Sequence, residues 1–540
     1  MNSKISKRQW LLTAVTLFLT SFVIFIHVQL RQYAFDDAYI HFRIARNLIE
    51  SGAPYYNASE ALKVSTSSGW IVFLAVIYGA VRIVSMESNF PLLISVLNAL
   101  ICIGDLIVYP KIVELLLKKP FTILQKLPLQ IIILALLLPS SIGLMETPVA
   151  LLTAGVGIYF LLGSKPAGCA LLGVAVYFRL ELVVLTLLIF TIAVIQQKLR
   201  LYRILGYFAL GSAPLILGDL YFYHTLVPHS IIAKSSVYSL TPLETLVAIL
   251  SRSLPGFPII DPLLKSGLFI LMIGILGWTV FRESVIRKNG RFSAMFYVAA
   301  LLVISIYLIS HTLLFDWYIP LYTLPMSIAY FAFSYSIEQP RNVIIRLPLF
   351  CLALLSTISI LTTTYSVLYK PNAYIDFESG SRVKMYLTVG KIIDEDYPGA
   401  TLLTSEIGAL GYSFRGKIFD AVGLASSDAL YFHPMKVPEQ RSSGGFGAIP
   451  PNYVKVVNPD IIVSYDTFAE ALLMDDFCSQ YNIISIPAYL PEDAMYSESK
   501  TIFGSRYVRV YIQKSLPVSD KLCALFISTG TPNTACTGSG

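Results

Sequence analysis

The sequence has little charge for its length. Only 14% of its 540 residues are Asp, Glu, Lys or Arg, whereas 55% are hydrophobic. Soluble globular proteins carry about 25% charged residues, so this composition excludes that class and predicts a polytopic membrane protein. The basic residues are scattered between apolar runs and form no stripe that would follow a nucleic-acid backbone. Nucleic acid is therefore not an expected partner.

Cysteine is also scarce, and no cysteine has metal-like spacing. Three of the six lie in apolar runs, where cysteine is usually a small core residue: Cys102, Cys169 and Cys351. The other three lie in the C-terminal part: Cys478, Cys523 and Cys536. One disulfide, such as Cys523 to Cys536, would leave the third of these free. The sequence also lacks a phosphate loop ending in Gly-Lys-Ser/Thr, so it predicts no nucleotide site.

Twelve apolar runs have spanning or near-spanning length. They cover residues 10–30, 70–86, 91–117, 128–145, 148–163, 166–179, 181–197, 203–222, 263–282, 294–314, 317–336 and 343–368. The basic residues ahead of the first run predict an uncleaved signal anchor with a cytoplasmic N-terminus. The basic loops at 111–126, 196–203, 282–291 and 341–346 are expected on the same, cytoplasmic side.

Strict alternation through all twelve runs contradicts this placement. If run 70–86 crosses the membrane, the basic loop 111–126 falls outside, whereas a re-entrant or interfacial run leaves every basic loop inside. We prefer the second interpretation, which predicts about eleven spans; a further pair of crossings, giving thirteen, would preserve the orientation. The polar residues at the ends of the apolar runs then collect on the external side.

The composition changes after residue 369. A predicted helix at 381–394 alternates with short strands at 401–405, 417–422, 460–464, 483–488 and 506–513. The predicted fold is therefore an α-helical membrane domain (1–370, first external loop 31–69) followed by a soluble, external α/β domain (371–515). The Ser-, Thr- and Gly-rich residues 516–540 are expected to form a flexible tail.

Two adjacent carboxylates, Asp36 and Asp37, directly follow the first apolar run, where charge close to lipid is costly. The next residues have the spacing of an amphipathic helix whose polar face carries Asp36, Tyr39, Arg43 and Asn47. Either carboxylate alone would suit the helix N-terminus. Two exceed what one cap needs, so the pair predicts chemistry.

Several stretches, taken together and in order, resemble the GT-C superfamily of membrane glycosyltransferases that use polyprenyl-phosphate sugars. They are residues 36–48 with Tyr56-Asn57 and Thr66-Ser67, Gly-Leu-Met-Glu-Thr-Pro at 143–148, Arg-Leu-Glu at 179–181, Pro-His-Ser-Ile-Ile-Ala-Lys at 228–234, Glu-Ile-Gly-Ala-Leu-Gly-Tyr at 406–412 and Asp-Ala-Val-Gly-Leu at 420–424. The resemblance covers residues 30–512 and is nearest to the bacterial group that includes terminal arabinofuranosyltransferases. Lys63-Val64 replaces the commoner acidic-glycine pair, which leaves the sugar open.

The resemblance implies transfer of a sugar from a polyprenyl-phosphate donor to a hydroxyl of a cell-envelope glycan or lipid-linked acceptor. The reaction would take place on the periplasmic face of a bacterial inner membrane. Asp36 is favoured as general base, with Asp37 orienting it, although the spacing does not decide between them. The donor phosphate would be bound by Lys234, Arg179 and His229.

The sugar or acceptor would be bound by a further set of residues: His41, Arg43, Glu146, Glu181, Tyr223 and Trp317. Structural roles are the alternatives to these assignments, such as ion pairs between Arg179 and the two glutamates, or a Lys234 that extends to the membrane interface. Trp317 also fits an aromatic belt. An intrinsic metal is weakly supported, and Asp36 and Asp37 sharing Mg²⁺ or Mn²⁺ is a minority alternative.

The main rival function is a secondary transporter or lipid flippase, in which buried charges serve translocation. Transporters commonly show repeated halves and binding charges near the membrane midplane, and this sequence shows neither. A catalytically silent scaffold is the third alternative.

Overall fold

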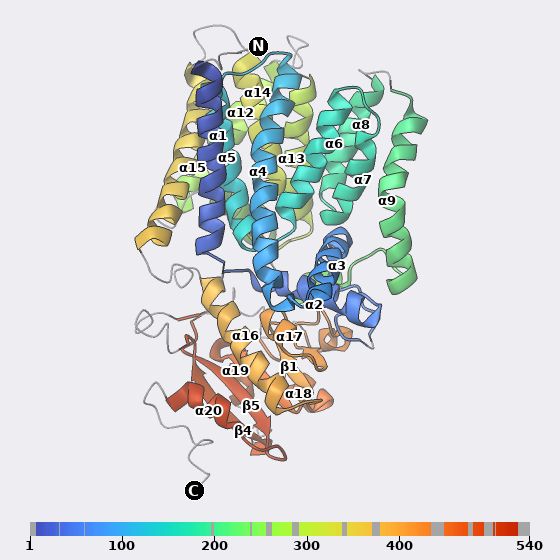
Figure 1. Ribbon diagram of the computed structural model, residues 1–540, viewed down its shortest axis with the longest axis vertical. Coiled ribbons are helices and arrows are strands. Elements are labelled where there is room, and N and C mark those ends of the chain that lie inside the picture. The colour runs from blue at the N-terminus through green and yellow to red at the C-terminus, as the bar shows by residue number, and fades with distance from the viewer. Residues whose placement is uncertain are drawn as a thin grey trace.

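The structure is a computed structural model. It describes residues 7–31, 33–58, 60–195, 199–237, 240–254, 262–282, 291–336, 343–369, 378–433, 448–473, 479–490, 501–502 and 504–527. Figure 1 shows two parts, a bundle of helices and a smaller domain with a sheet at one end of it. The N-terminus lies at the opposite end of the bundle from this domain (Figure 1).

Each of the twelve predicted apolar runs contains a helix. These helices are α1 (Lys7–Gln29), α3 (Ser68–Ile83), α4 (Phe90–Leu117), α5 (Ile123–Ile142), α6 (Thr147–Leu162), α7 (Gly168–Phe178), α8 (Leu182–Ile195), α9 (Leu201–Tyr223), α12 (Pro262–Phe281), α13 (Arg291–Ile309), α14 (Pro320–Ser336) and α15 (Val343–Tyr369). Within the described ranges, five helical stretches are long and apolar enough to cross a membrane, at 87–117, 123–142, 201–223, 263–281 and 347–369. The length and composition of the helices thus indicate a membrane protein, but they do not by themselves support eleven spans.

Helices α1 and α4 run along the bundle, whereas α2 (Asp36–Ser51) and α3 lie at the end that faces the smaller domain (Figure 1). The short helices η1 (Glu87–Asn89), α10 (His229–Val237) and α11 (Pro242–Arg252) complete this part. The position of α3 agrees with the alternative in which run 70–86 does not cross the membrane. Small residues allow close packing within the bundle, since a Cβ at Gly211 of α9 would overlap the backbone of Ala170 on α7.

The C-terminal domain contains a sheet in the order β2-β1-β3-β5-β4. The five strands are β1 (Leu402–Thr404), β2 (Ile418–Asp420), β3 (Ile461–Tyr465), β4 (Tyr481–Pro487) and β5 (Tyr507–Gln513), which confirms the five predicted strands. The domain's helices are α16 (Glu378–Asp396), α17 (Ala409–Ser413), η5 (Ser427–Phe432), α18 (Pro451–Val457), α19 (Asp466–Leu473) and α20 (Asp520–Ile527). Strands β1, β2 and β3 are parallel, and β5 is antiparallel to both β3 and β4.

Helix α20 corrects the prediction of a flexible tail over 516–540. Leu522 is fully buried, and the Lys521 ammonium lies 2.9 Å from carboxylate oxygens of both Glu395 and Asp396. The apolar residues of α20 therefore pack on the domain, and residues 528–540 lie outside the described residues. Cys523 on α20 is disulfide-bonded, but Cys478 and Cys536 also lie outside the described residues, so the predicted pairing stays a prediction.

The C-terminal domain docks on α2 through a buried carboxylate. Asp36 accepts hydrogen bonds from the backbone N–H groups of Gly408 (3.0 Å) and Ala409 (2.8 Å). The backbones approach so closely that a Cβ at position 408 would overlap the Asp36 main chain and side chain. Glycine is therefore required at 408 by the docking of the two domains.

Arg43, about two turns further along the same face of α2, makes the second docking contact. Its guanidinium is 3% exposed and donates to four carbonyl groups, those of Tyr56 (2.8 Å), Gly411, Phe414 (2.6 Å) and Gly416 (2.8 Å). Three of these carbonyls belong to the C-terminal domain. The polar face predicted for α2 is therefore confirmed, but Asp36 and Arg43 on this face bind the C-terminal domain.

We predict that Gly408→Ala weakens the docking by about 1–3 kcal/mol, because the added methyl group has no space. Limited proteolysis between Tyr369 and Glu378 should become faster, and the thermal unfolding midpoint should fall. Gly206→Ala on α9 is the control, since no heavy atom lies within 4 Å of an added Cβ there. A cleavage rate equal to that of the wild type in Gly408→Ala would contradict the docking contact.

Candidate functional site

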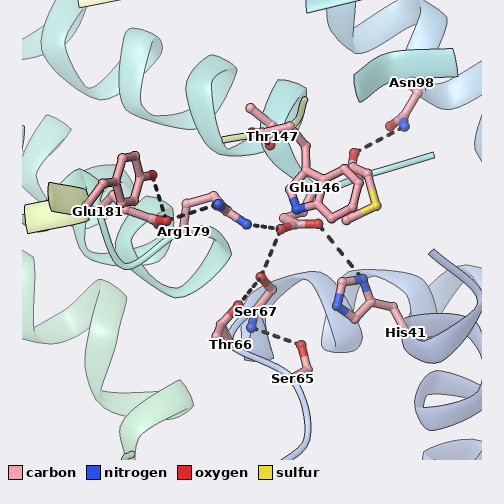
Figure 2. A network of polar contacts seen from close by, with 12 residues as sticks. His41, Ser65, Thr66, Ser67, Asn98, Glu146, Thr147, Arg179 and Glu181 are labelled. Atoms are coloured by element: carbon pink, nitrogen blue, oxygen red, sulfur yellow. Dashed lines mark hydrogen bonds and ion pairs between the residues drawn. The ribbon is translucent and has the colours of Figure 1, made fainter. Parts of the chain in front are cut away.

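Glu146 is the centre of a buried polar network at the end of the bundle near the C-terminal domain. It immediately precedes α6 and is 1% exposed. Figure 2 shows its carboxylate between Arg179, Ser67 and His41. Arg179 Nη1 donates to Glu146 Oε1 over 2.6 Å, and the Ser67 hydroxyl donates to the same oxygen over 3.2 Å. Burial alone would raise the pKa of Glu146, but the charge of the Arg179 guanidinium and its hydrogen bond outweigh burial and hold it below its ordinary value.

Backbone contacts hold the turn that carries Glu146. Asn98 on α4 donates its side-chain amide to the carbonyl groups of Ser141 and Met145, both over 3.3 Å. The Thr147 hydroxyl donates to the carbonyl of Trp317 over 2.8 Å. The turn that carries Glu146 is therefore held by α4 and by the segment just before α14.

Arg179 follows α7 and joins Glu146 to Glu181. Its second terminal nitrogen, Nη2, donates to Glu181 Oε1 over 3.0 Å, and Tyr307 on α13 donates its hydroxyl to the same oxygen over 3.0 Å. The guanidinium lies 4.5 Å from the centre of the Tyr318 ring. Both of its terminal nitrogens thus contact carboxylates. This ion pairing is the alternative to phosphate binding that the sequence left open for Arg179.

His41 on α2 faces Glu146 from the other side (Figure 2). Its Nδ1 lies 3.9 Å from Glu146 Oε2, and neither atom has a hydrogen-bond partner among the described residues. Burial lowers the pKa of His41, opposed by the charges of Glu146 and Asp37, while Arg179 and Lys234 lower it further. Charged side chains from four separate parts of the sequence thus act on one histidine.

A pocket of about 320 Å³ lies beside this network. Its polar lining includes Thr66, Glu181, Ser230, Lys234 and Tyr307. Ser235, Ser310, His311, Thr312 and Tyr318 also line it. The apolar lining, which makes up most of the pocket surface, comes from α8, α10, α13 and adjoining residues: Leu180, Val183, Val184, Ile231, Ile306 and Leu313. One cation and one carboxylate thus share a largely apolar pocket.

The two adjacent aspartates differ in their surroundings. Burial raises the pKa of Asp36, opposed by Arg382 and by the N–H groups that it accepts. Both of its oxygens are occupied by those N–H groups. Asp37 is partly exposed, and within the described part of the chain its carboxylate makes no hydrogen bond. Asp37 is thus the more accessible of the two aspartates.

The other predicted site residues lie at the edge of the pocket or away from it. Trp317 is buried and stacks on Phe315, with ring centres 4.7 Å apart. Tyr223 donates its hydroxyl to the carbonyl of Pro54. His229 donates from Nε2 to the carbonyl of Gly423 in the C-terminal domain, over 3.0 Å. These residues, like Arg43, therefore contact other protein groups, as residues with a structural role do.

The described residues contain no group of three or more His, Cys, Asp or Glu side chains that would hold a metal ion. Each Asp36 carboxylate oxygen accepts one backbone N–H group, and a carboxylate oxygen has a second lone pair that a cation could use. The sharing of Mg²⁺ or Mn²⁺ by Asp36 and Asp37 therefore stays a prediction.

Sequence reasoning missed a buried ion pair next to the site. Lys63 Nζ lies 2.6 Å from Asp219 Oδ2, and the two side chains are 5% and 4% exposed. Ser68 donates to the other Asp219 oxygen, and the carbonyl of Lys63 accepts the N–H of His229. The sequence signal for this pair is Asp219, a lone acidic residue within the apolar run 203–222. A charge in such a run is costly unless it is paired.

Residues 374–511, which include the sheet of the C-terminal domain, match the model of a family described as a domain of unknown function (DUF8728). No curated protein matches the chain.

We predict that Lys63→Met lowers the free energy of unfolding by about 3–5 kcal/mol, because it leaves the Asp219 carboxylate buried and unpaired. The double variant Lys63→Met/Asp219→Leu should recover most of that loss. Lys521→Met removes an exposed ion pair and should leave the free energy of unfolding nearly unchanged, because exposed pairs contribute little. Unfolding in detergent measures all three variants, and additive losses in the double variant would contradict the pairing.

Proposed function

We propose that this protein is a membrane glycosyltransferase that moves a sugar from a polyprenyl-phosphate donor to a hydroxyl acceptor. The observation that carries the proposal is the pocket that combines Lys234 and Glu181 with an apolar wall, beside the cluster of His41, Glu146 and Arg179. Such a pocket offers a cation for a phosphate, a carboxylate for sugar hydroxyls and an apolar surface for a lipid chain. The acceptor would be a cell-envelope glycan or a lipid-linked glycan.

The donor phosphate is assigned to Lys234. Its ammonium lies 5.2 Å from the centre of the Phe315 ring, and the residue lines the pocket together with Ser230. When the bond between the anomeric carbon and the phosphate oxygen breaks, negative charge develops on the departing polyprenyl phosphate. An ammonium group held in a poorly hydrated pocket stabilises that charge.

Asp37 is the better candidate for the general base. Its charge acts on His41 beside the pocket, and its carboxylate is partly exposed. Asp36, favoured by the sequence, instead accepts two backbone N–H groups of the C-terminal domain. In this assignment Asp37 takes the proton of the acceptor hydroxyl while the acceptor oxygen bonds to the anomeric carbon.

The proposed location is a bacterial inner membrane, crossed by about eleven helices, with the N-terminus cytoplasmic and the C-terminal domain periplasmic. The separation of the N-terminus from this domain in Figure 1 supports the orientation. The disulfide at Cys523 is also typical of an oxidising compartment, whereas Cys102, Cys169 and Cys351 in the bundle are free.

Transfer of labelled sugar from synthetic polyprenyl-phosphate sugars by the purified protein tests the function. Asp37→Asn should lower kcat by about 10²- to 10⁴-fold without changing proteolysis between the domains. Asp36→Asn should lower transfer and also accelerate that proteolysis, because an amide cannot accept both N–H groups. Glu50→Gln, at the other end of α2 against Tyr78, is the control. Full activity of Asp37→Asn would reject the base, and failure of the wild type with every donor would favour the transporter.

Cysteine labelling in sealed inverted and right-side-out vesicles tests the orientation. Lys119→Cys, after α4, should react with an impermeant maleimide only from the cytoplasmic side. Val227→Cys, an exposed residue just before α10, should react only from the periplasmic side. Reaction of both from one side would overturn the proposed topology.

A further inference from the structure

The C-terminal domain contacts both of the elements that carry the proposed base and the proposed phosphate ligand. On α2 it donates to Asp36, the residue next to Asp37. On α10 it accepts a hydrogen bond from His229, five residues before Lys234, and η5 packs against the same helix.

The two contact points leave the sheet from neighbouring strands. Gly408 follows β1, which ends at Thr404, and Gly423 follows β2, which ends at Asp420. The strands pair in parallel, with Leu403 opposite Phe419. Paired strands are held about 4.8 Å apart, so the two loops emerge at one edge with a fixed separation.

The loop that accepts from His229 is itself rigid. The buried Asp420 carboxylate accepts the N–H groups of Val422 (2.9 Å) and Ala425 (2.8 Å). Gly423 has a φ of +92°, a conformation that glycine adopts without strain. The Gly423 carbonyl therefore presents a fixed direction to α10.

His229 itself is not part of the pocket lining, although Ser230 and Lys234 on the same helix are. Its backbone N–H donates to Lys63 over 2.8 Å, and its ring donates to Gly423. Both contacts go to protein carbonyls. The ring is therefore engaged by the C-terminal domain and not directed at a donor phosphate.

We propose that the C-terminal domain is a rigid brace between α2 and α10, and that His229 is a positioning residue through which it holds Lys234 relative to Asp37. The catalytic consequence rests on the proposed glycosyltransferase function. The mechanical part does not, because it concerns only the separation of two helices. Loss of the His229 contact would let α10 move and place Lys234 incorrectly.

A distance measurement tests the brace without any substrate. Spin labels on Ile49→Cys of α2 and Ile232→Cys of α10, both exposed positions, should give a narrow distance distribution. The distribution should broaden in His229→Ala and narrow again in His229→Gln, whose amide also donates. Ser236→Ala on the same helix is the control, and protein without the two introduced cysteines gives the background. An unchanged distribution in His229→Ala would overturn the brace.

Kinetics then separate positioning from direct phosphate binding. His229→Ala and Gly423→Ala, which strains the accepting loop, should each lower kcat by about 10- to 100-fold with little change in donor KM. The double variant should lose no more than either single variant, because both break one contact. Additive losses with a raised donor KM would mean that His229 binds the phosphate. A broadened distribution in a protein that transfers no sugar would reject the proposed function and leave the brace intact.

Discussion

The architecture depends on satisfying a guanidinium that is buried between two domains. Arg43 has five N–H groups to satisfy and is almost inaccessible to water, so an unpaired donor there would be costly. The carbonyl groups of Gly411, Phe414 and Gly416, together with that of Tyr56 in the loop after α2, accept four hydrogen bonds from it. The Tyr56 hydroxyl in turn donates to Ile407 over 2.6 Å. One side chain thereby fixes the loop after α2 and the C-terminal domain to this helix.

This constraint gives the two adjacent aspartates different roles. The helix that buries Arg43 also turns Asp36 toward Gly408 and Ala409. Its neighbour Asp37 lies about 100° around the helix and is partly exposed. Docking therefore engages Asp36, and Asp37 is the carboxylate that we propose as the general base.

Much of the fold could be predicted from the sequence, because apolar runs and alternating strands are local signals. The twelve helices and five strands follow from them. The partners of polar residues could not be predicted in the same way. Arg43 meets Gly411 across 368 residues, and Lys63 meets Asp219 across 156 residues. A helical wheel identifies a polar face but does not show whether that face contacts substrate or another domain. The sequence therefore assigns Arg43 to the sugar or acceptor, whereas in the structure it binds the C-terminal domain.

The charges of the candidate site also distinguish Arg179 from Lys234. Arg179 directs its two terminal nitrogens at Glu146 and Glu181, so an arriving phosphate would have to displace a carboxylate from a short contact. With neutral His41, these three residues sum to one negative charge, which disfavours an anion. The phosphate ligand that we propose is therefore Lys234, which lines the pocket. Arg179 instead holds Glu181 at the pocket wall, where a carboxylate can accept hydrogen bonds from sugar hydroxyls.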